Sequence, residues 1–115
     1  MSAPGSTQAM SPVLTGVTVM KDGVDYALCP FFGKCDGLLV IEPTALKVTF
    51  IPNANRDPES LSDLILAAKI KHLICGFIPD TERKKLRRAG IDVRCGSCAC
   101  TVDELIVDFA NLPEA

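Results

Sequence analysis

Six cysteines are the residues of this 115-residue chain whose types and spacing point most directly to chemistry. The densest group is Cys95, Cys98 and Cys100, which follow a C-x-x-C-x-C pattern. This spacing lets two or three thiolates reach one metal ion, and thiolates suit zinc, copper(I) and iron-sulfur centres. We expect Gly96 to give the backbone the freedom to wrap the ion. The pattern therefore predicts a metal site with Cys95, Cys98 and Cys100 as ligands.

The remaining cysteines are candidates to complete that site. A zinc ribbon has a second, distant C-x-x-C, which this sequence lacks, so further ligands must come from Cys29, Cys35 or Cys75. A single cysteine in an apolar strand is more often an inert core residue, and we favour that interpretation for Cys75. Cys29 and Cys35 fall in a loop, where burial is less expected, and for them the two interpretations stand even.

Two other functions stay open beside metal binding. Cys95 and Cys98 could form a reversible disulfide in a redox protein or sensor. Thioredoxin-like proteins, however, place C-x-x-C at a helix start after the first strand, whereas here it lies near the end of the chain. A third hypothesis is an interaction domain without metal, whose cysteines are structural.

Other reactive side chains give little support for catalysis. His72 is the only histidine, so the usual Cys-His and Ser-His pairs have no base, and we expect the protein not to be an enzyme. We expect His72 to lie away from the cysteines, at the start of a strand. The basic run at residues 83–88 is typical of a solvated helix face, although it also fits docking to an acidic partner or an anionic cofactor.

The composition limits the possible partners and the cellular location of the protein. The net charge of −2 gives no general attraction to nucleic acid or anionic lipid. The longest uncharged apolar stretches are far shorter than the roughly 20 residues of a membrane span. Six cysteines without a signal peptide pattern predict a reducing, cytoplasmic location. We expect residues 1–12, rich in small residues and proline, to be a disordered tail, and residues 13–115 to form one domain.

The cysteines must be positioned by alternating strands and helices. Apolar and β-branched runs predict strands at residues 13–20, 37–41, 47–52, 72–77 and 91–93. Helix-start signals occur at Asp57-Pro58, at Pro79-Asp80 and at Thr101, where Glu104 completes a capping box. The second and third strands should form a hairpin, and the helix-linked strands should be parallel. All six cysteines then map near carboxyl-terminal strand ends, the edge that forms the ligand crevice of an open α/β sheet.

Several segments resemble the dinitrogenase iron-molybdenum cofactor biosynthesis family over about residues 13–112. These are Phe31-Phe32-Gly33-Lys34 before a strand ending Val40-Ile41-Glu42, then Leu73-Ile74-Cys75-Gly76-Phe77-Ile78, Leu86-Arg87-Arg88-Ala89-Gly90-Ile91-Asp92-Val93 and Thr101-Val102-Asp103-Glu104-Leu105. Each is weak alone, but their order and spacing are specific. The sequence departs from the family in two places: Phe31 stands where the family commonly has His, and the segment from Cys95 to Cys100 is richer in sulfur than the usual glycine-containing loop.

The resemblance implies a fold, a function and partners. The fold would be a three-layer α/β domain with a ribonuclease H-like motif and a mixed five-stranded sheet. The function would be that of a cytoplasmic metallocluster carrier linked to nitrogen fixation. Its cargo would be a metal or metal-sulfur cluster of iron or molybdenum, with zinc or copper also compatible with sulfur ligands, and its partners would be cluster donor and acceptor proteins. The cofactor would lie in the crevice formed by the cysteine-bearing loops, with contributions from Cys29, Cys35, Cys75, Phe32 and Gly33.

Overall fold

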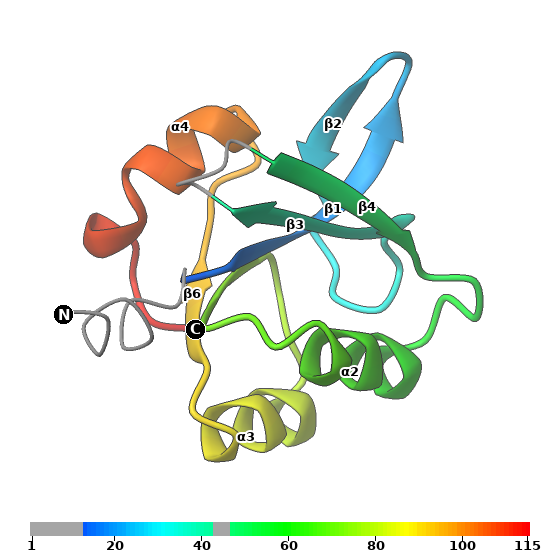
Figure 1. Ribbon diagram of the computed structural model, residues 1–115, viewed down its shortest axis with the longest axis vertical. Coiled ribbons are helices and arrows are strands. Elements are labelled where there is room, and N and C mark those ends of the chain that lie inside the picture. Colours follow the sequence, from blue (N-terminus) through cyan, green and yellow to red (C-terminus); the bar gives the residue numbers. More distant parts are fainter. Residues whose placement is uncertain (1–12, 43–46) are drawn as a thin grey trace, which may run out of the picture.

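The computed structural model describes residues 13–42 and 47–115, so the tail expected at residues 1–12 lies outside the described part of the chain. The elements follow one another from the blue end to the red end of Figure 1. In chain order they are β1 (Thr15–Asp22), β2 (Asp25–Leu28), β3 (Gly37–Glu42), β4 (Lys47–Pro52), α2 (Pro58–Ala67), β5 (His72–Cys75), α3 (Asp80–Arg88), β6 (Asp92–Cys95), α4 (Val102–Val107) and the 3-10 helix η1 (Phe109–Asn111). The five expected strands and the three expected helix starts are all present.

One mixed sheet organises these elements. Its main path runs β4-β3-β1-β5-β6, and β2 pairs with β1 outside this path. The β3–β4 hairpin is antiparallel, as the sequence predicts. The strands reached through helices are parallel, because β5 pairs in parallel with β1 and β6 in parallel with β5. The predicted class of fold, a mixed α/β sheet, is therefore confirmed, and residues 13–42 and 47–115 contribute six strands to the sheet where five were expected.

The extra strand, β2, is the element that the sequence interpretation missed. We expected an irregular stretch after the first strand, but β1 continues to Asp22 and turns back at once into β2. Gly23 has φ of 64° at the first central position of this two-residue turn, as a type II′ hairpin requires. Glycine at this first central position is the sequence signal of a type II′ hairpin turn. The sequence interpretation took this turn only as the end of the first strand, because Asp25–Leu28 is too short to show a clear alternation.

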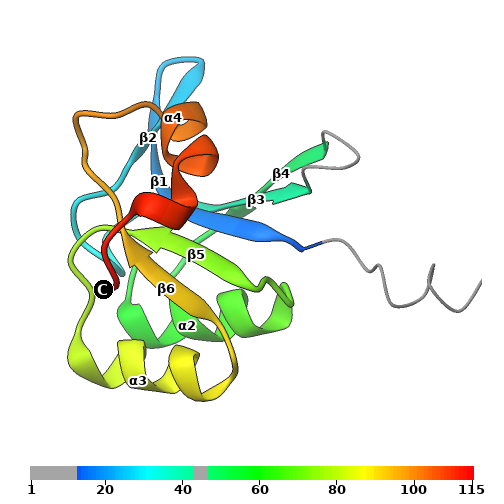
Figure 2. The same cartoon turned by 90° about the vertical axis from the view of Figure 1, so that its left-hand side faces the viewer.

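Helices cover both faces of the sheet and complete three layers (Figures 1 and 2). On one face, α2 and α3 bury Leu61, Ile65 and Leu86 in a core cluster that also contains Leu38 and Leu73. On the other face, α4 and η1 pack Leu105 and Phe109 against a second cluster. The central strand β1 is buried along its first five residues, from Thr15 to Val19.

The predicted caps form as expected. Asp57 caps α2 by accepting a hydrogen bond of 2.7 Å from the backbone N–H of Ser60. Thr101 and Glu104 form the reciprocal capping box of α4, with hydrogen bonds of 2.8 and 3.1 Å. Each cap satisfies backbone donors that have no partner inside the helix.

The basic helix α3 is largely paired within the chain. Arg83 and Lys84 contact Asp80, and Lys85 contacts Asp63 across to α2. Arg87 binds Glu114. These pairs favour the interpretation of the run as a solvated face over docking to an acidic partner.

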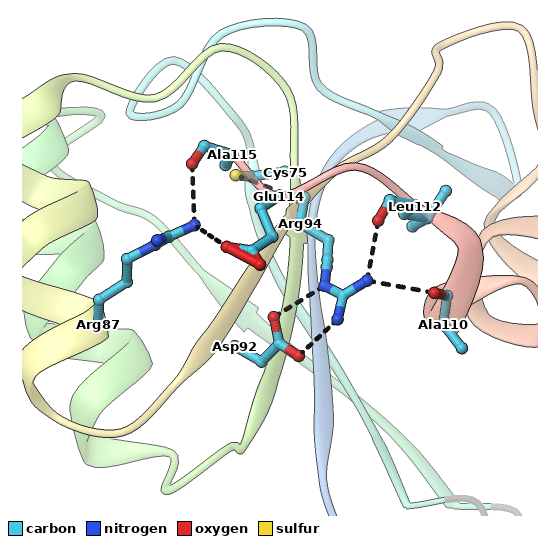
Figure 3. Close-up of polar contacts among 8 residues, drawn as sticks. All are labelled: Cys75, Arg87, Asp92, Arg94, Ala110, Leu112, Glu114 and Ala115. Carbon is cyan, nitrogen blue, oxygen red and sulfur yellow. Dashed lines mark hydrogen bonds and ion pairs between the residues drawn. The ribbon is translucent and has the colours of Figure 1, made fainter.

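The C-terminal segment, residues 112–115, is hydrogen-bonded along β6, the edge strand of the sheet (Figure 3). The Arg94 guanidinium donates hydrogen bonds to both carboxylate oxygens of Asp92, at 2.8 and 3.0 Å. It also donates to the carbonyl of Leu112 at 2.9 Å. Backbone hydrogen bonds join Cys95 to Pro113 at 2.8 Å and Ala115 to Val93 at 3.1 Å. The segment therefore covers backbone groups of β6 that would otherwise form an open edge. Within the described ranges, no helix has the length and hydropathy needed to cross a membrane.

Candidate metal centre

Three loops that bear cysteines meet at the carboxyl-terminal edge of β5 and β6, at the left of Figure 2. Cys75 and Cys95 are the last residues of their strands and are paired in register. Cys29 reaches the same level because the β1–β2 hairpin returns the chain to mid-strand, where the Cys29 N–H donates to the carbonyl of Thr18 at 2.9 Å. The sequence predicted that distant cysteines lie close together at this edge, and for Cys29 this position depends on the β1–β2 hairpin.

Backbone contacts hold two of these loops together. Phe31 and Phe77 form a parallel bridge, with hydrogen bonds of 2.8 Å from the Phe32 N–H to the Phe77 carbonyl and from the Phe77 N–H to the Pro30 carbonyl. A Cβ at Gly76 would lie only 2.4 Å from the Pro30 carbonyl oxygen, so the close approach requires glycine. The rings of Phe31 and Phe77 remain 58% and 69% exposed at this edge.

The three isolated cysteines are core residues. Cys29, Cys35 and Cys75 are all buried in the cluster beneath α2 and α3. This agrees with the interpretation favoured for Cys75. For Cys29 and Cys35, for which the two interpretations stood even, burial favours the core interpretation. The loop folds inward because the Asn53 side chain donates to the carbonyls of Gly33 and Cys35, at 3.3 and 3.2 Å.

Burial also keeps these three thiols protonated. Desolvation raises the pKa of Cys35 to about 11 and that of Cys75 to about 12. Burial likewise raises the pKa of Cys29, and the nearby charges of Asp36 and Cys98 add to the rise. A neutral thiol is a poor metal ligand, since the thiolate is the binding species.

The clustered cysteines are accessible but do not converge. Cys98 is exposed, while Cys95 and Cys100 are partly exposed. Cys95 shares the sheet face of its partner Cys75, whereas Cys100 packs in the cluster on the α4 face. Across residues 13–42 and 47–115, no three His, Cys, Asp or Glu side chains are grouped closely enough to hold a metal ion.

The segment between these cysteines is held by few hydrogen bonds. Its hydrogen bonds among described residues are local: Ser97 accepts from the N–H groups of Ala99 and Cys100, each at 3.1 Å. Gly96 just before it is anchored, and its N–H donates to the Cys75 carbonyl at 2.9 Å. A Cβ there would approach Ile74 to 2.9 Å. The expectation that Gly96 provides flexibility was therefore wrong, since its small size serves close packing.

The two non-cysteine residues of the predicted crevice have different positions. Phe32 is buried, and its ring belongs to the core beneath α2. Gly33 has φ of 88° and lies so close to Pro58 that an added Cβ would approach it to 2.8 Å. Both residues shape the loop that carries Cys29 and Cys35. Phe31, where the family commonly has His, is exposed, as is Lys34 at the end of the motif.

His72 lies at the other end of β5, as expected. Its ring stacks on Phe109 with centroids 4.1 Å apart. This position separates it from the cysteine-bearing loops by the length of the strand.

A cavity of about 660 Å³ adjoins the clustered cysteines on the α4 face. Cys98 and Cys100 line one end of it, and the β1–β2 hairpin contributes Asp22, Asp25 and Tyr26. The sequence interpretation missed these three residues because it did not recognise β2. The Asp22-Gly23 turn was the signal that would have placed them beside the cysteines.

The fold and these loops define a class of protein: a three-layer α/β domain with thiols at the carboxyl-terminal edge of its parallel strands. Residues 15–112 match the family described as dinitrogenase iron-molybdenum cofactor, and the chain belongs to that family. The family is thus one associated with the iron-molybdenum cofactor, which confirms the resemblance drawn from the sequence.

Solved structures support the fold. The apo form of the orange protein from Desulfovibrio gigas superposes with a TM-score of 0.79 at 19% identity, over 91% of this chain and 94% of that one. A NifB-like protein from Thermotoga gives 0.73 at 16% identity, over 89% and 92%. No curated protein matches the sequence. At these identities the likeness establishes the fold alone.

Proposed function

We propose that this protein is a cytoplasmic, non-enzymatic carrier of a metal or metal-sulfur cluster, bound through Cys95, Cys98 and Cys100. The observation that carries the proposal is the accessibility of these three thiols on one short segment at the ligand edge of the sheet. Membership of an iron-molybdenum cofactor family supports the same class of cargo.

The chemistry of the donor set fits such a cargo. Thiolates bind soft and borderline metals and the iron of iron-sulfur clusters, which they supply with strong sulfur ligation. To close around a metal, the segment from Ser97 to Cys100 would break its own local hydrogen bonds and move Cys100 from its packed position against the core on the α4 face. Metal binding would then be coupled to ordering of this segment.

The buried thiols have a secondary role in the proposal. Cys29, Cys35 and Cys75 would each have to lose a proton inside the core before binding a metal. Cys29 is a candidate to complete the site, because Cys98 lies near enough to add to the rise in its pKa. Phe32 and Gly33 would contribute by shaping the loop behind Cys29 rather than by direct contact with the metal.

The proposal also covers the metal that is carried, the partner proteins and the bounds of the domain. We propose iron or molybdenum as the metal, with cluster donor and acceptor proteins as partners. Residues 13–115 would act as one domain, since from Leu14 to Ala115 the described residues contribute to the same two core clusters about a single sheet.

Anaerobic reconstitution tests the proposal. Reduced protein is incubated with iron and sulfide, or with molybdate and sulfide, and then analysed for metal, sulfide and ultraviolet-visible absorption. We expect bound metal with thiolate charge-transfer bands, reduced at least about tenfold in Cys98→Ser. Cys75→Ala is the matched control, because it removes a buried thiol on the neighbouring strand, and it should retain the metal.

A failed reconstitution would distinguish between the proposed function and its redox alternative. Protein that stays colourless and free of metal in every condition would contradict the carrier function. If that protein instead formed a Cys95–Cys98 disulfide at a potential near the cytosolic poise, the redox alternative would replace it.

A further inference from the structure

The cavity on the α4 face lies between the short helix α4 and the β1–β2 hairpin. α4 has six residues and leaves part of the sheet beyond it uncovered. Figures 1 and 2 both show α4 beside β2, with the hairpin extending past it. The resulting cavity of about 660 Å³ is large enough for one or two apolar side chains of another molecule.

Its floor and walls are apolar. Leu39 and Ile41 of β3 form the floor, and Val102 and Ile106 of α4 form one wall. Val48 of β4 stands at the rim with 56% of its surface exposed. An exposed β-branched side chain next to an apolar hollow is a surface that gains free energy when another apolar group covers it.

The mouth of the cavity is negatively charged. Asp22, Asp25 and Asp103 line it and are exposed, and none of the lining residues within the described ranges is Lys, Arg or His. Two lysines lie nearby but do not line the cavity. The Lys21 ammonium sits 4.7 Å from the centroid of the Phe50 ring, and Lys47 is the cross-strand partner of Glu42. The mouth therefore attracts cationic groups.

We propose that this cavity docks a basic segment of a partner protein, with an apolar side chain inserted over Leu39 and Ile41 and flanking Lys or Arg side chains paired with Asp22, Asp25 and Asp103. The apolar floor supplies contact area, and the three carboxylates select the charge of the partner. Cys98 and Cys100 line the same cavity, so the docked segment lies beside the thiols. If the proposed function holds, this partner is one that delivers or receives the metal.

Peptide binding to the full, metal-free chain tests the docking surface independently of metal uptake. The probe is a fluorescent peptide with Leu and Phe between pairs of lysines, and its counterpart has glutamates in place of the lysines. We expect fluorescence anisotropy at low salt to detect the lysine peptide only. The triple variant Asp22→Asn, Asp25→Asn, Asp103→Asn should weaken its binding about tenfold.

A matched control separates this site from net charge. Glu59→Gln, Asp63→Asn and Glu82→Gln remove the same charge from the α2 and α3 face and should leave the affinity within about twofold. Val48→Arg places a cation at the exposed rim and should weaken binding as much as the triple variant. Circular dichroism checks that each variant is folded.

Three results would overturn the docking proposal. They are equal binding of both peptides, equal loss in the control triple variant, and a dimer of this chain that Val48→Arg disrupts, which would assign the cavity to a second copy. Each leaves the metal-binding proposal standing, because reconstitution is measured without a partner. Metal uptake can likewise fail while peptide binding succeeds.

Discussion

At the scale of single residues, burial divides the six cysteines into two chemical populations. Cys29, Cys35 and Cys75 are desolvated and protonated, whereas Cys95, Cys98 and Cys100 reach solvent. The spacing of residues 95–100 predicted an accessible group, but it could not reveal that Cys95 and Cys100 belong to opposite faces of the sheet. That separation depends on where β6 ends and α4 begins, which is a property of the packed fold.

The raised pKa values of the buried thiols predict a pH dependence of stability. The native state keeps its protons on Cys35 and Cys75 up to pKa values of about 11 and about 12, while the unfolded chain loses them near pH 8.5. Above that pH the native state binds more protons, so the free energy of unfolding falls as pH rises. Each thiol contributes up to about 1.4 kcal/mol per pH unit.

Urea unfolding of metal-free, reduced protein between pH 8 and 10 measures this slope. Cys75→Ala should make the free energy of unfolding fall less steeply with pH, because one of the buried thiols is then missing. Cys98→Ala, at an exposed position, is the control for the loss of a cysteine side chain outside the core. An identical slope in wild type and Cys75→Ala would show that the buried thiol is not the source.

At the scale of elements, the crevice depends on loops that approach each other at the level of the backbone. The strands and helix starts were predictable, because β-branched runs and capping residues act locally. The β1–β2 hairpin was not, although it delivers Cys29 to the sheet edge and Tyr26 to the cavity. Four residues of β2 carry too little pattern to stand out, and their pairing with β1 is what makes them a strand.

Gly76 lies where the loops after β2 and β5 approach each other at the level of the backbone, so its substitution tests that approach. A Cβ there would lie 2.6 Å from the Cys29 carbonyl oxygen and 2.4 Å from that of Pro30, both backbone atoms. Gly76→Ala must therefore separate the loops after β2 and β5, and we expect a loss of about 2 to 4 kcal/mol in the free energy of unfolding.

Gly90→Ala is the control for this substitution. Gly90 has φ of 88° but no atom within 4 Å of an added Cβ, so only backbone strain of about 1 kcal/mol is expected. Chemical denaturation of the two variants gives the comparison. Equal losses would mean that the loop approach at Gly76 is not tight.

At the scale of the whole molecule, one sheet edge carries the exposed thiols and one face carries the acidic cavity beside them. The opposite layer, with α2 and α3, is a packed and internally paired body that supports this edge. The C-terminal segment adds to the support, because its backbone bonds to β6 end at Cys95, next to the clustered cysteines. The general architecture followed from the order of strands and helices, whereas the position of the cavity required the length of α4 and the pairing of β2.

The most direct test of the central claim is differential alkylation of the reconstituted protein, read by mass spectrometry of its peptides. Metal-free protein should react with iodoacetamide at Cys98 first, then at Cys95 and Cys100, and hardly at all at Cys75. Loading with metal should slow alkylation of Cys95, Cys98 and Cys100 at least about tenfold and leave Cys75 unreactive in both states. Loaded protein whose three clustered cysteines react as fast as those of the metal-free protein would contradict their assignment as ligands.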